Sequence, residues 1–113
     1  MTTIYHNPRC RKSRETLAIL EEKKEEITII KYLETPPSEK ELTKMITLLG
    51  ISPLALVRKN ESIWKENFKG KDLNDNQLIK IMADNPILIE RPIVIKGNKA
   101  IIGRPPEIVK DIL

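Results

Sequence analysis

The only cysteine of the chain, Cys10, lies among cationic side chains, an environment that suits attack on an oxyanion. Four basic residues flank it: Arg9, Arg11, Lys12 and Arg14. A cysteine beside cations at the start of a helix can have its pKa lowered from about 8.5 to roughly 3.5–7.5, which favours the reactive thiolate. The same surroundings would also hold a phosphate-like anion. Taken alone, the pattern fits a nucleophile and an incidental cysteine beside a solvated basic turn about equally well.

The residues around this cysteine predict a strand over residues 2–5 and a helix from about residue 11 to residue 24. Arg11, Lys12 and Arg14 would then stand in the first helical turn. Cations there oppose the partial positive charge of the helix N-terminus, at a cost of roughly 0.3–1 kcal/mol per charge at exposed sites. We therefore expect negative charge at this point, supplied by the Cys10 thiolate or by a bound anion.

Composition narrows the class of protein. With 113 residues the chain is long enough for one domain with a single core, and its lone cysteine cannot form an internal disulfide. We expect a reducing cytoplasmic setting, because the chain has one cysteine and begins with no apolar leader. Membrane insertion is not expected, because no apolar run approaches the ~20 residues of a membrane span. We also expect a monomer. The net charge of +4 is dispersed and aromatic residues make up 4%, so nucleic-acid binding is not expected. One histidine and one cysteine cannot form a four-ligand zinc site, so no metal is expected.

Strands and helices are both predicted at the two ends of the chain, whereas only helices are predicted in the middle. A second strand over residues 27–30 would complete a parallel βαβ unit. Ser38 and Glu41 form a capping box that opens a helix ending at Gly50. Ser52 caps a short helix that begins at Pro53, and a third helix begins near residues 74–75. The block from residue 38 to residue 84 is therefore predicted to be entirely helical.

The C-terminal part returns to strands. Residues 93–95 and 100–102 flank the pair Gly97-Asn98, which predicts a hairpin with a two-residue turn. A last helix is expected to begin at the prolines 105–106. This order resembles a thioredoxin-like α/β fold: a core of residues 1–37 and 85–113, made of a βαβ and a ββα half, with residues 38–84 as a helical insertion in a single domain, 1–113. The resemblance gives Pro92 the place of a cis proline beside the active-site sulfur, and Ser13 the place of a resolving cysteine.

Five segments together resemble the ArsC arsenate reductases of the glutaredoxin-linked class, in that family's order and over nearly the whole chain. The segments are His6-Asn7-Pro8-x-Cys10, residues 32–37, residues 58–60, the run from Asn85 to Val94, and Arg104-Pro105. The run after the cysteine, beginning at Arg11 where the best-known members carry a small residue, is more similar to the YfgD-like subgroup.

The resemblance implies a role for each of these residues. Cys10 would be the nucleophile, Arg58, Arg91 and Arg104 would surround the oxyanion, and His6 would stand near the nucleophile. Guanidinium groups suit a tetrahedral anion because each can bind two of its oxygens. Other roles remain open: Arg58 could cap a helix, the other two arginines could merely flank prolines, and His6 could either acidify the thiol or brace the loop.

The implied reaction needs a thiol from outside the chain, since Ser13 replaces the second cysteine. Cys10 would attack arsenate to give a covalent adduct, and in the family glutathione and glutaredoxin then complete the reduction to arsenite, with no bound cofactor. In the YfgD-like subgroup the oxyanion could differ from arsenate.

Three other classes of protein deserve comparison. A cysteine phosphatase would place an arginine six residues after the cysteine, where this chain has Thr16. Spx-like relatives bind RNA polymerase and use a two-cysteine switch, whereas this chain has one cysteine; a non-catalytic role in binding a partner stays open. A monothiol redox protein would need Cys10 but would tolerate loss of Arg91 and Arg104.

Overall fold

The structure is a computed structural model that describes all residues, 1–113, and the chain forms two compact units. The first, which we call the sheet unit, comprises Met1–Thr35 and Arg91–Leu113, and the second, the helical unit, comprises Pro36–Glu90. The boundaries predicted from the sequence were 37/38 and 84/85. None of the helices combines the length and apolar character that a membrane span requires.

The sheet unit is built on four strands in the order β2-β1-β3-β4. Their bounds are β1 (Thr2–His6), β2 (Ile27–Lys31), β3 (Ile93–Lys96) and β4 (Lys99–Ile102). Strand β1 runs parallel to β2 and antiparallel to β3, while β3 and β4 form a hairpin. Gly97 adopts a φ of +61° in the turn of this hairpin, a conformation that glycine reaches without steric cost. The predicted parallel pair and hairpin are confirmed.

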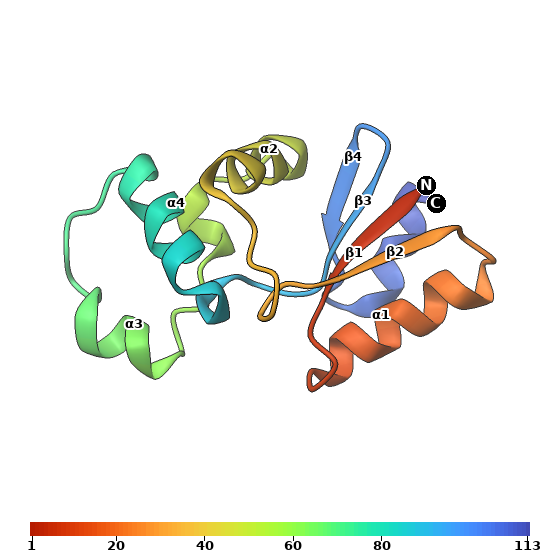
Figure 1. Ribbon diagram of the computed structural model, residues 1–113, viewed down its shortest axis with the longest axis horizontal. Coiled ribbons are helices and arrows are strands. Elements are labelled where there is room, and N and C mark those ends of the chain that lie inside the picture. The colour runs from red at the N-terminus through yellow and green to blue at the C-terminus, as the bar shows by residue number, and fades with distance from the viewer. The chain divides into compact units, whose positions relative to one another are not determined.

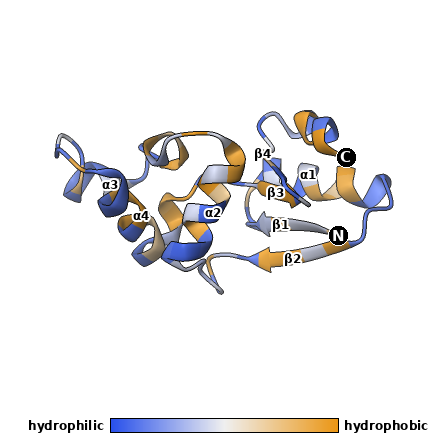
Figure 2. Cartoon of the chain, turned by 90° about the horizontal axis from the view of Figure 1, so that it is seen from above, coloured by the Kyte–Doolittle hydropathy of each residue, from blue (hydrophilic) through white to orange (hydrophobic).

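Two helices of this unit share one core with the sheet (Figure 1). They are α1 (Arg11–Glu22) and a C-terminal 3₁₀ helix (Pro106–Ile112). Four fully buried side chains, one each from β1, α1, β3 and the 3₁₀ helix, form its centre: Ile4, Leu20, Val94 and Val109. Figure 2 shows the hydrophobic character of β3, the strand that is buried between two neighbours. The core thus packs α1 and the C-terminal 3₁₀ helix against β1 and β3 of the sheet.

Helix boundaries follow the sequence signals closely in most places. Helix α1 ends at Glu22, two residues before the predicted end, and Lys24 has a positive φ of 58° that no α-helix accommodates. The last helix begins at the predicted prolines but has 3₁₀ rather than α geometry. The fold class, α/β with βαβ and ββα halves around a helical insertion, is confirmed.

The helical unit contains three α-helices and two 3₁₀ turns. They are α2 (Glu39–Leu49), α3 (Ser62–Asn67), α4 (Asp75–Asp84) and the turns Pro53–Leu56 and Pro86–Leu88. The predicted capping box of Ser38 and Glu41 is present, and Gly50 ends α2 with a φ of +68°. Asn74 opens α4 with a second capping box. Helix α3 has no side-chain cap, which explains why its start was not predicted.

Candidate active site

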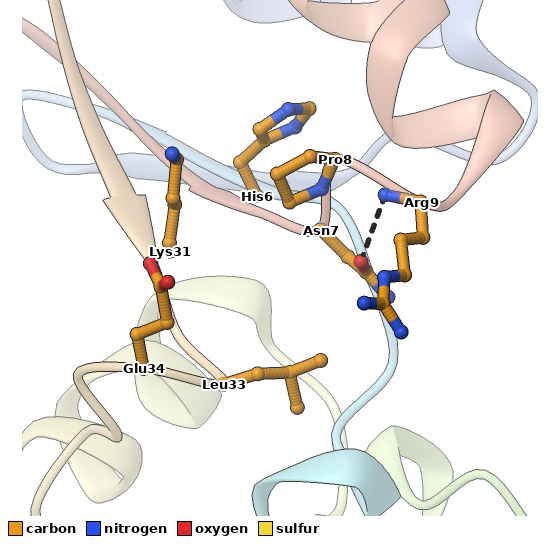
Figure 3. A pocket seen from close by; sticks show the side chains of 7 residues that line it. All are labelled: His6, Asn7, Pro8, Arg9, Lys31, Leu33 and Glu34. Atoms are coloured by element: carbon orange, nitrogen blue, oxygen red, sulfur yellow. Dashed lines mark hydrogen bonds between the residues drawn. The ribbon is translucent and has the colours of Figure 1, made fainter.

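Cys10 occupies the N-cap position of α1, with its backbone extended at φ −92° and ψ 120°. Cys10 ends a tight turn that begins at Asn7. In this turn the Cys10 N–H donates to the Asn7 carbonyl oxygen at 2.9 Å. The Asn7 side-chain oxygen accepts from the Arg9 N–H at 3.0 Å (Figure 3), so one asparagine shapes the turn with both its acceptors. The predicted position of the cysteine at the start of the helix is confirmed, and its side chain is 9% exposed.

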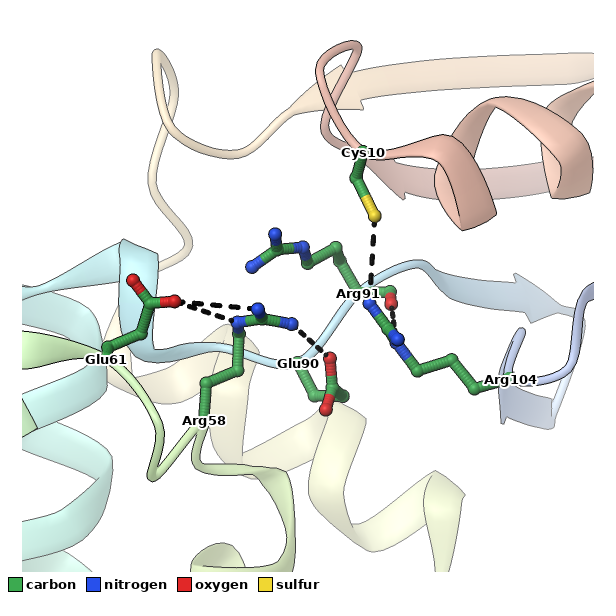
Figure 4. Close-up of polar contacts among 6 residues, drawn as sticks. All are labelled: Cys10, Arg58, Glu61, Glu90, Arg91 and Arg104. Carbon is green, nitrogen blue, oxygen red and sulfur yellow. Dashed lines mark hydrogen bonds and ion pairs between the residues drawn. The ribbon is translucent and has the colours of Figure 1, made fainter.

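Three donors act on the Cys10 sulfur. The Arg104 Nη2 donates to Sγ at 3.6 Å (Figure 4). The Arg91 side chain and the Ser13 backbone N–H also hydrogen-bond to the sulfur. Burial raises the pKa of the Cys10 thiol, but the hydrogen bonds from Arg91 and Ser13 and the charges of Arg91 and Arg104 outweigh it. The net effect is a pKa below the ordinary value of a cysteine thiol. The site therefore stabilises the thiolate relative to that of an ordinary cysteine.

The two arginines lie side by side at the open end of the β3–β4 hairpin, Arg91 before β3 and Arg104 after β4. Its register pairs Ile93 with Ile102, and the Gly103 N–H continues the pattern by donating to the Pro92 carbonyl oxygen at 2.9 Å. Arg91 and Arg104 follow as the next pair, and the Arg104 Nε donates to the Arg91 carbonyl oxygen at 2.7 Å. The Arg91–Pro92 peptide bond is cis, as expected for Pro92, and so is Arg104–Pro105. Backbone pairing thus places both guanidinium groups at the thiol.

Gly103 makes this close approach of the hairpin to α1 feasible. A Cβ at this position would lie 2.6 Å from Thr16 Oγ1 and 2.9 Å from Pro92 Cγ, which is closer than van der Waals contact allows. Thr16 is fully buried, so its side chain has little room to move. Only glycine fits beside Arg104, although nothing in the local sequence indicates this requirement.

His6 braces the loop, and it is not among the groups that lower the pKa of Cys10. Its Nδ1 lies 2.6 Å from the Ser13 hydroxyl, which also accepts from the Asn7 N–H at 3.1 Å. Burial, the Lys31 charge and the Arg14 charge, in that order, lower the pKa of His6, which favours the neutral ring. Ser13 is fully buried. Its hydroxyl hydrogen-bonds to the loop, and its backbone N–H hydrogen-bonds to the Cys10 sulfur. A neutral, bonded His6 matches the role of a brace better than that of a cation at the thiol.

Arg58 belongs to the helical unit, where two carboxylates hold it. Its Nη1 forms an ion pair with Glu90 Oε1 at 2.8 Å, and its Nε lies 3.4 Å from Glu61 Oε2 (Figure 4). The segment is further fixed by backbone bonds, because the Arg58 N–H donates to the Leu88 carbonyl oxygen at 2.7 Å. Its predicted contact with an oxyanion remains a prediction.

Comparison with known proteins identifies the family. A model of the ArsC family matches residues 5–112. The chain belongs to the ArsC family. It is 48% identical to the uncharacterized protein YfgD of Escherichia coli, over 97% of this chain and 94% of that protein. It is 49% identical to an Escherichia coli arsenate reductase, over 98% of this chain and 79% of the relative.

Solved structures agree with this assignment. An arsenate reductase structure from Vibrio cholerae matches with a TM-score of 0.94 and 48% identity, over 99% of this chain and 97% of that one. The ArsC family chain therefore has the thioredoxin-like fold that the sequence predicted. The predicted resemblance to the ArsC family is confirmed, and the chain is similar both to YfgD and to arsenate reductases.

The structure of this ArsC family member brings six of the predicted site residues into one unit: His6, Cys10, Ser13, Arg91, Pro92 and Arg104. Pro92 joins the hairpin through its carbonyl oxygen. The carboxylate partners of Arg58 and the tight fit at Gly103 were not predicted from the sequence. Both depend on residues distant in sequence, and a single sequence carries no signal for either.

Proposed function

We propose that this protein is an arsenate reductase in which Cys10 is the nucleophile. The observation that carries the proposal is the thiol at the N-cap of α1, with a lowered pKa and with Arg91 and Arg104 against its sulfur. A thiolate alone would repel an anionic substrate, whereas guanidinium groups bind tetrahedral oxyanions through charge-assisted hydrogen bonds. The Escherichia coli and Vibrio cholerae relatives are named arsenate reductases, which supports arsenate as the anion.

The first step forms a bond between sulfur and arsenic. The Cys10 thiolate attacks the arsenic of arsenate, one As–O bond breaks, and the leaving oxygen takes up a proton and departs as water. Arsenic remains pentavalent in this adduct. The arginines act by stabilising the negative charge that the attack concentrates on the remaining oxygens. Arg58 is proposed as a third arginine of this group from the family resemblance.

Two further thiols complete the reduction. A glutathione thiol displaces a second hydroxyl from arsenic as water and forms a second S–As bond. A glutaredoxin thiolate then attacks the glutathione sulfur, so that the two sulfurs form a disulfide and the electron pair of the broken S–As bond reduces arsenic to the trivalent state. Water hydrolyses the remaining bond to Cys10 and releases arsenite with the free thiol. A cytoplasmic thiol pool would supply both reductants, with no bound cofactor.

Arsenite production tests this proposal directly. Purified protein is incubated with arsenate, glutathione and glutaredoxin, beside Cys10→Ser and the double variant Arg91→Ala, Arg104→Ala. Arg11→Ala is the matched control, because Arg11 follows Cys10 at the start of α1 but pairs with Glu15 at the surface. We expect loss of turnover in the first two variants and full turnover in the control. An intact native thiol that produces no arsenite with any thiol donor would reject arsenate reduction and favour a partner-binding protein.

A further inference from the structure

A cavity of about 330 Å³ lies entirely within the helical unit. It is lined by Lys59 and by residues of the turn Pro53–Leu56, of α3 and α4, and of the loop that joins these two helices (Figure 1). None of the residues of the proposed reaction lines it. Sites for small ligands in proteins occupy about 300–1,000 Å³, so the volume suits a ligand at the small end of that range.

The apolar part of the lining centres on Trp64, the only tryptophan of the chain. Leu54, Leu73 and Leu78 complete it, and Leu54 is 42% exposed. The Trp64 side chain is 7% exposed, yet its indole N–H donates to no group of the protein and is not fully buried. A buried indole N–H usually has a partner, so this donor is left for solvent or for a ligand.

Two lysines border the apolar lining. Lys59 and Lys71 are exposed, and neither forms an ion pair. The Lys71 Nζ lies 5.9 Å from the centroid of the Phe68 ring, which packs against Trp64 with 5.8 Å between the ring centroids. The Lys71 N–H donates to the Phe68 carbonyl oxygen at 3.1 Å, so the backbone fixes this lysine beside the aromatic pair. Asp72 is the only acidic residue of the lining, and the cations therefore favour an anionic ligand.

We propose that this cavity binds a small amphiphilic carboxylate, with its apolar stem on Leu54 and Trp64 and its carboxylate at Lys59 and Lys71. An exposed lysine by itself attracts a carboxylate only weakly. Each methylene that is buried against an apolar lining strengthens binding about fourfold. A ligand that carries both groups uses the whole lining, whereas a simple anion or a neutral apolar molecule uses only part of it. The inference does not depend on the proposed arsenate reduction.

Trp64 makes binding measurable without any reaction. Hexanoate, which does not absorb where tryptophan is excited, is titrated into the whole protein while tryptophan emission is followed. We expect a saturable change of emission. Hexanamide has a stem of the same length but no charge, and it should bind about two- to fivefold more weakly, the range expected for loss of one exposed charge contact. Acetate, which lacks the stem, should give no saturable change over the same concentrations.

Matched variants test the two halves of the lining separately. Lys71→Gln should weaken hexanoate binding by about two- to fivefold and leave hexanamide binding unchanged. The control Lys65→Gln removes an exposed lysine of α3 that does not line the cavity, and it should change neither. Leu54→Ala should weaken binding of both ligands. Its control, Ile87→Ala, removes a side chain that is 43% exposed and lies outside the lining, and it should change neither.

The location of binding is read from backbone amide shifts in an NMR titration with hexanoate. We expect the shifts to centre on the cavity, at residues 54, 59, 64 and 70–78. Urea unfolding shows that each variant is folded before its dissociation constant is compared. A linear change of emission without saturation, shifts centred elsewhere, equal binding of hexanoate and hexanamide, or equal effects of Lys71→Gln and Lys65→Gln would each overturn the proposal.

Discussion

The arginines of the two units differ in what they contact. In the helical unit, Arg58 is bound by the carboxylates of Glu61 and Glu90, which offset its charge. In the sheet unit, Arg104 contacts a thiol sulfur and the carbonyl oxygen of Arg91. A guanidinium beside a carboxylate needs no ligand to explain its position, whereas one beside a thiol changes the acidity of that thiol.

This difference distinguishes an arginine that stabilises the fold from arginines that change the acidity of the Cys10 thiol. Arg91 and Arg104 both lower the pKa of Cys10, and Arg58 is not among the groups that do so. The bond between Arg58 and Glu90 instead joins residues 32 positions apart and accompanies backbone pairing between their segments. In its present contacts Arg58 therefore stabilises the helical unit.

The largest effect is expected from removing one arginine at the sulfur. Arg104→Ala should lower kcat/KM for arsenate by about 10²–10³, the cost typical of losing one donor to a developing oxyanion. Arg11→Ala should stay within about twofold, because a surface i,i+4 pair contributes little. Steady-state arsenite production measures both. Equal losses in the two variants would remove the distinction between arginines at the sulfur and a surface cation of α1.

Gly103→Ala tests the packing that brings the sheet-unit arginines to the thiol. The added methyl would crowd Thr16 and Pro92, so we expect destabilisation by about 1–3 kcal/mol. Urea unfolding measures this change. Adding Thr16→Ala should recover part of the loss, because it removes the nearest obstructing atoms. Purely additive effects of the two substitutions would show that the crowding is relieved in another way.

A smaller effect is expected in the helical unit. Glu90→Gln should destabilise the protein by up to about 1 kcal/mol, since the pair with Arg58 is short but partly exposed. Glu61→Gln should cost less, because its contacts with Arg58 are 3.4 and 3.5 Å long. Urea unfolding ranks the two. A larger loss from Glu61→Gln would mean that the longer contacts are the ones that hold Arg58.

The smallest effect concerns the loop brace. NMR titration of His6, the only histidine, should give a pKa below 6.5. Lys31→Ala should raise that pKa, because the Lys31 charge is one of its causes. The unfolded chain binds the proton more readily, so the contribution of His6 to stability is complete above about pH 6.5 and is lost as the pH falls through the folded-state value. A His6 pKa above 6.5 would contradict burial of a neutral ring.

Local chemistry made much of the fold predictable, and distant contacts account for what was missed. The capping box at Ser38 and the turn at Gly97 depend only on residues that are neighbours in the sequence, so the helix and the hairpin were both predicted. Helix α3 lacks a side-chain cap and was not predicted as a separate helix. The same rule holds at the site: Cys10 was found from its flanking cations, whereas the fit of Gly103 against Thr16 joins residues 87 positions apart.

The most direct test of this account is the acidity of Cys10 in matched arginine variants. Thiolate absorbance near 240 nm is followed against pH in the native protein, Arg91→Ala and Arg58→Ala, with Cys10→Ser as the blank. We expect a native pKa below that of an ordinary cysteine, a clear rise in Arg91→Ala, and no change in Arg58→Ala. An ordinary native pKa, or an equal rise in both arginine variants, would contradict the claim that the sheet-unit arginines create the nucleophile.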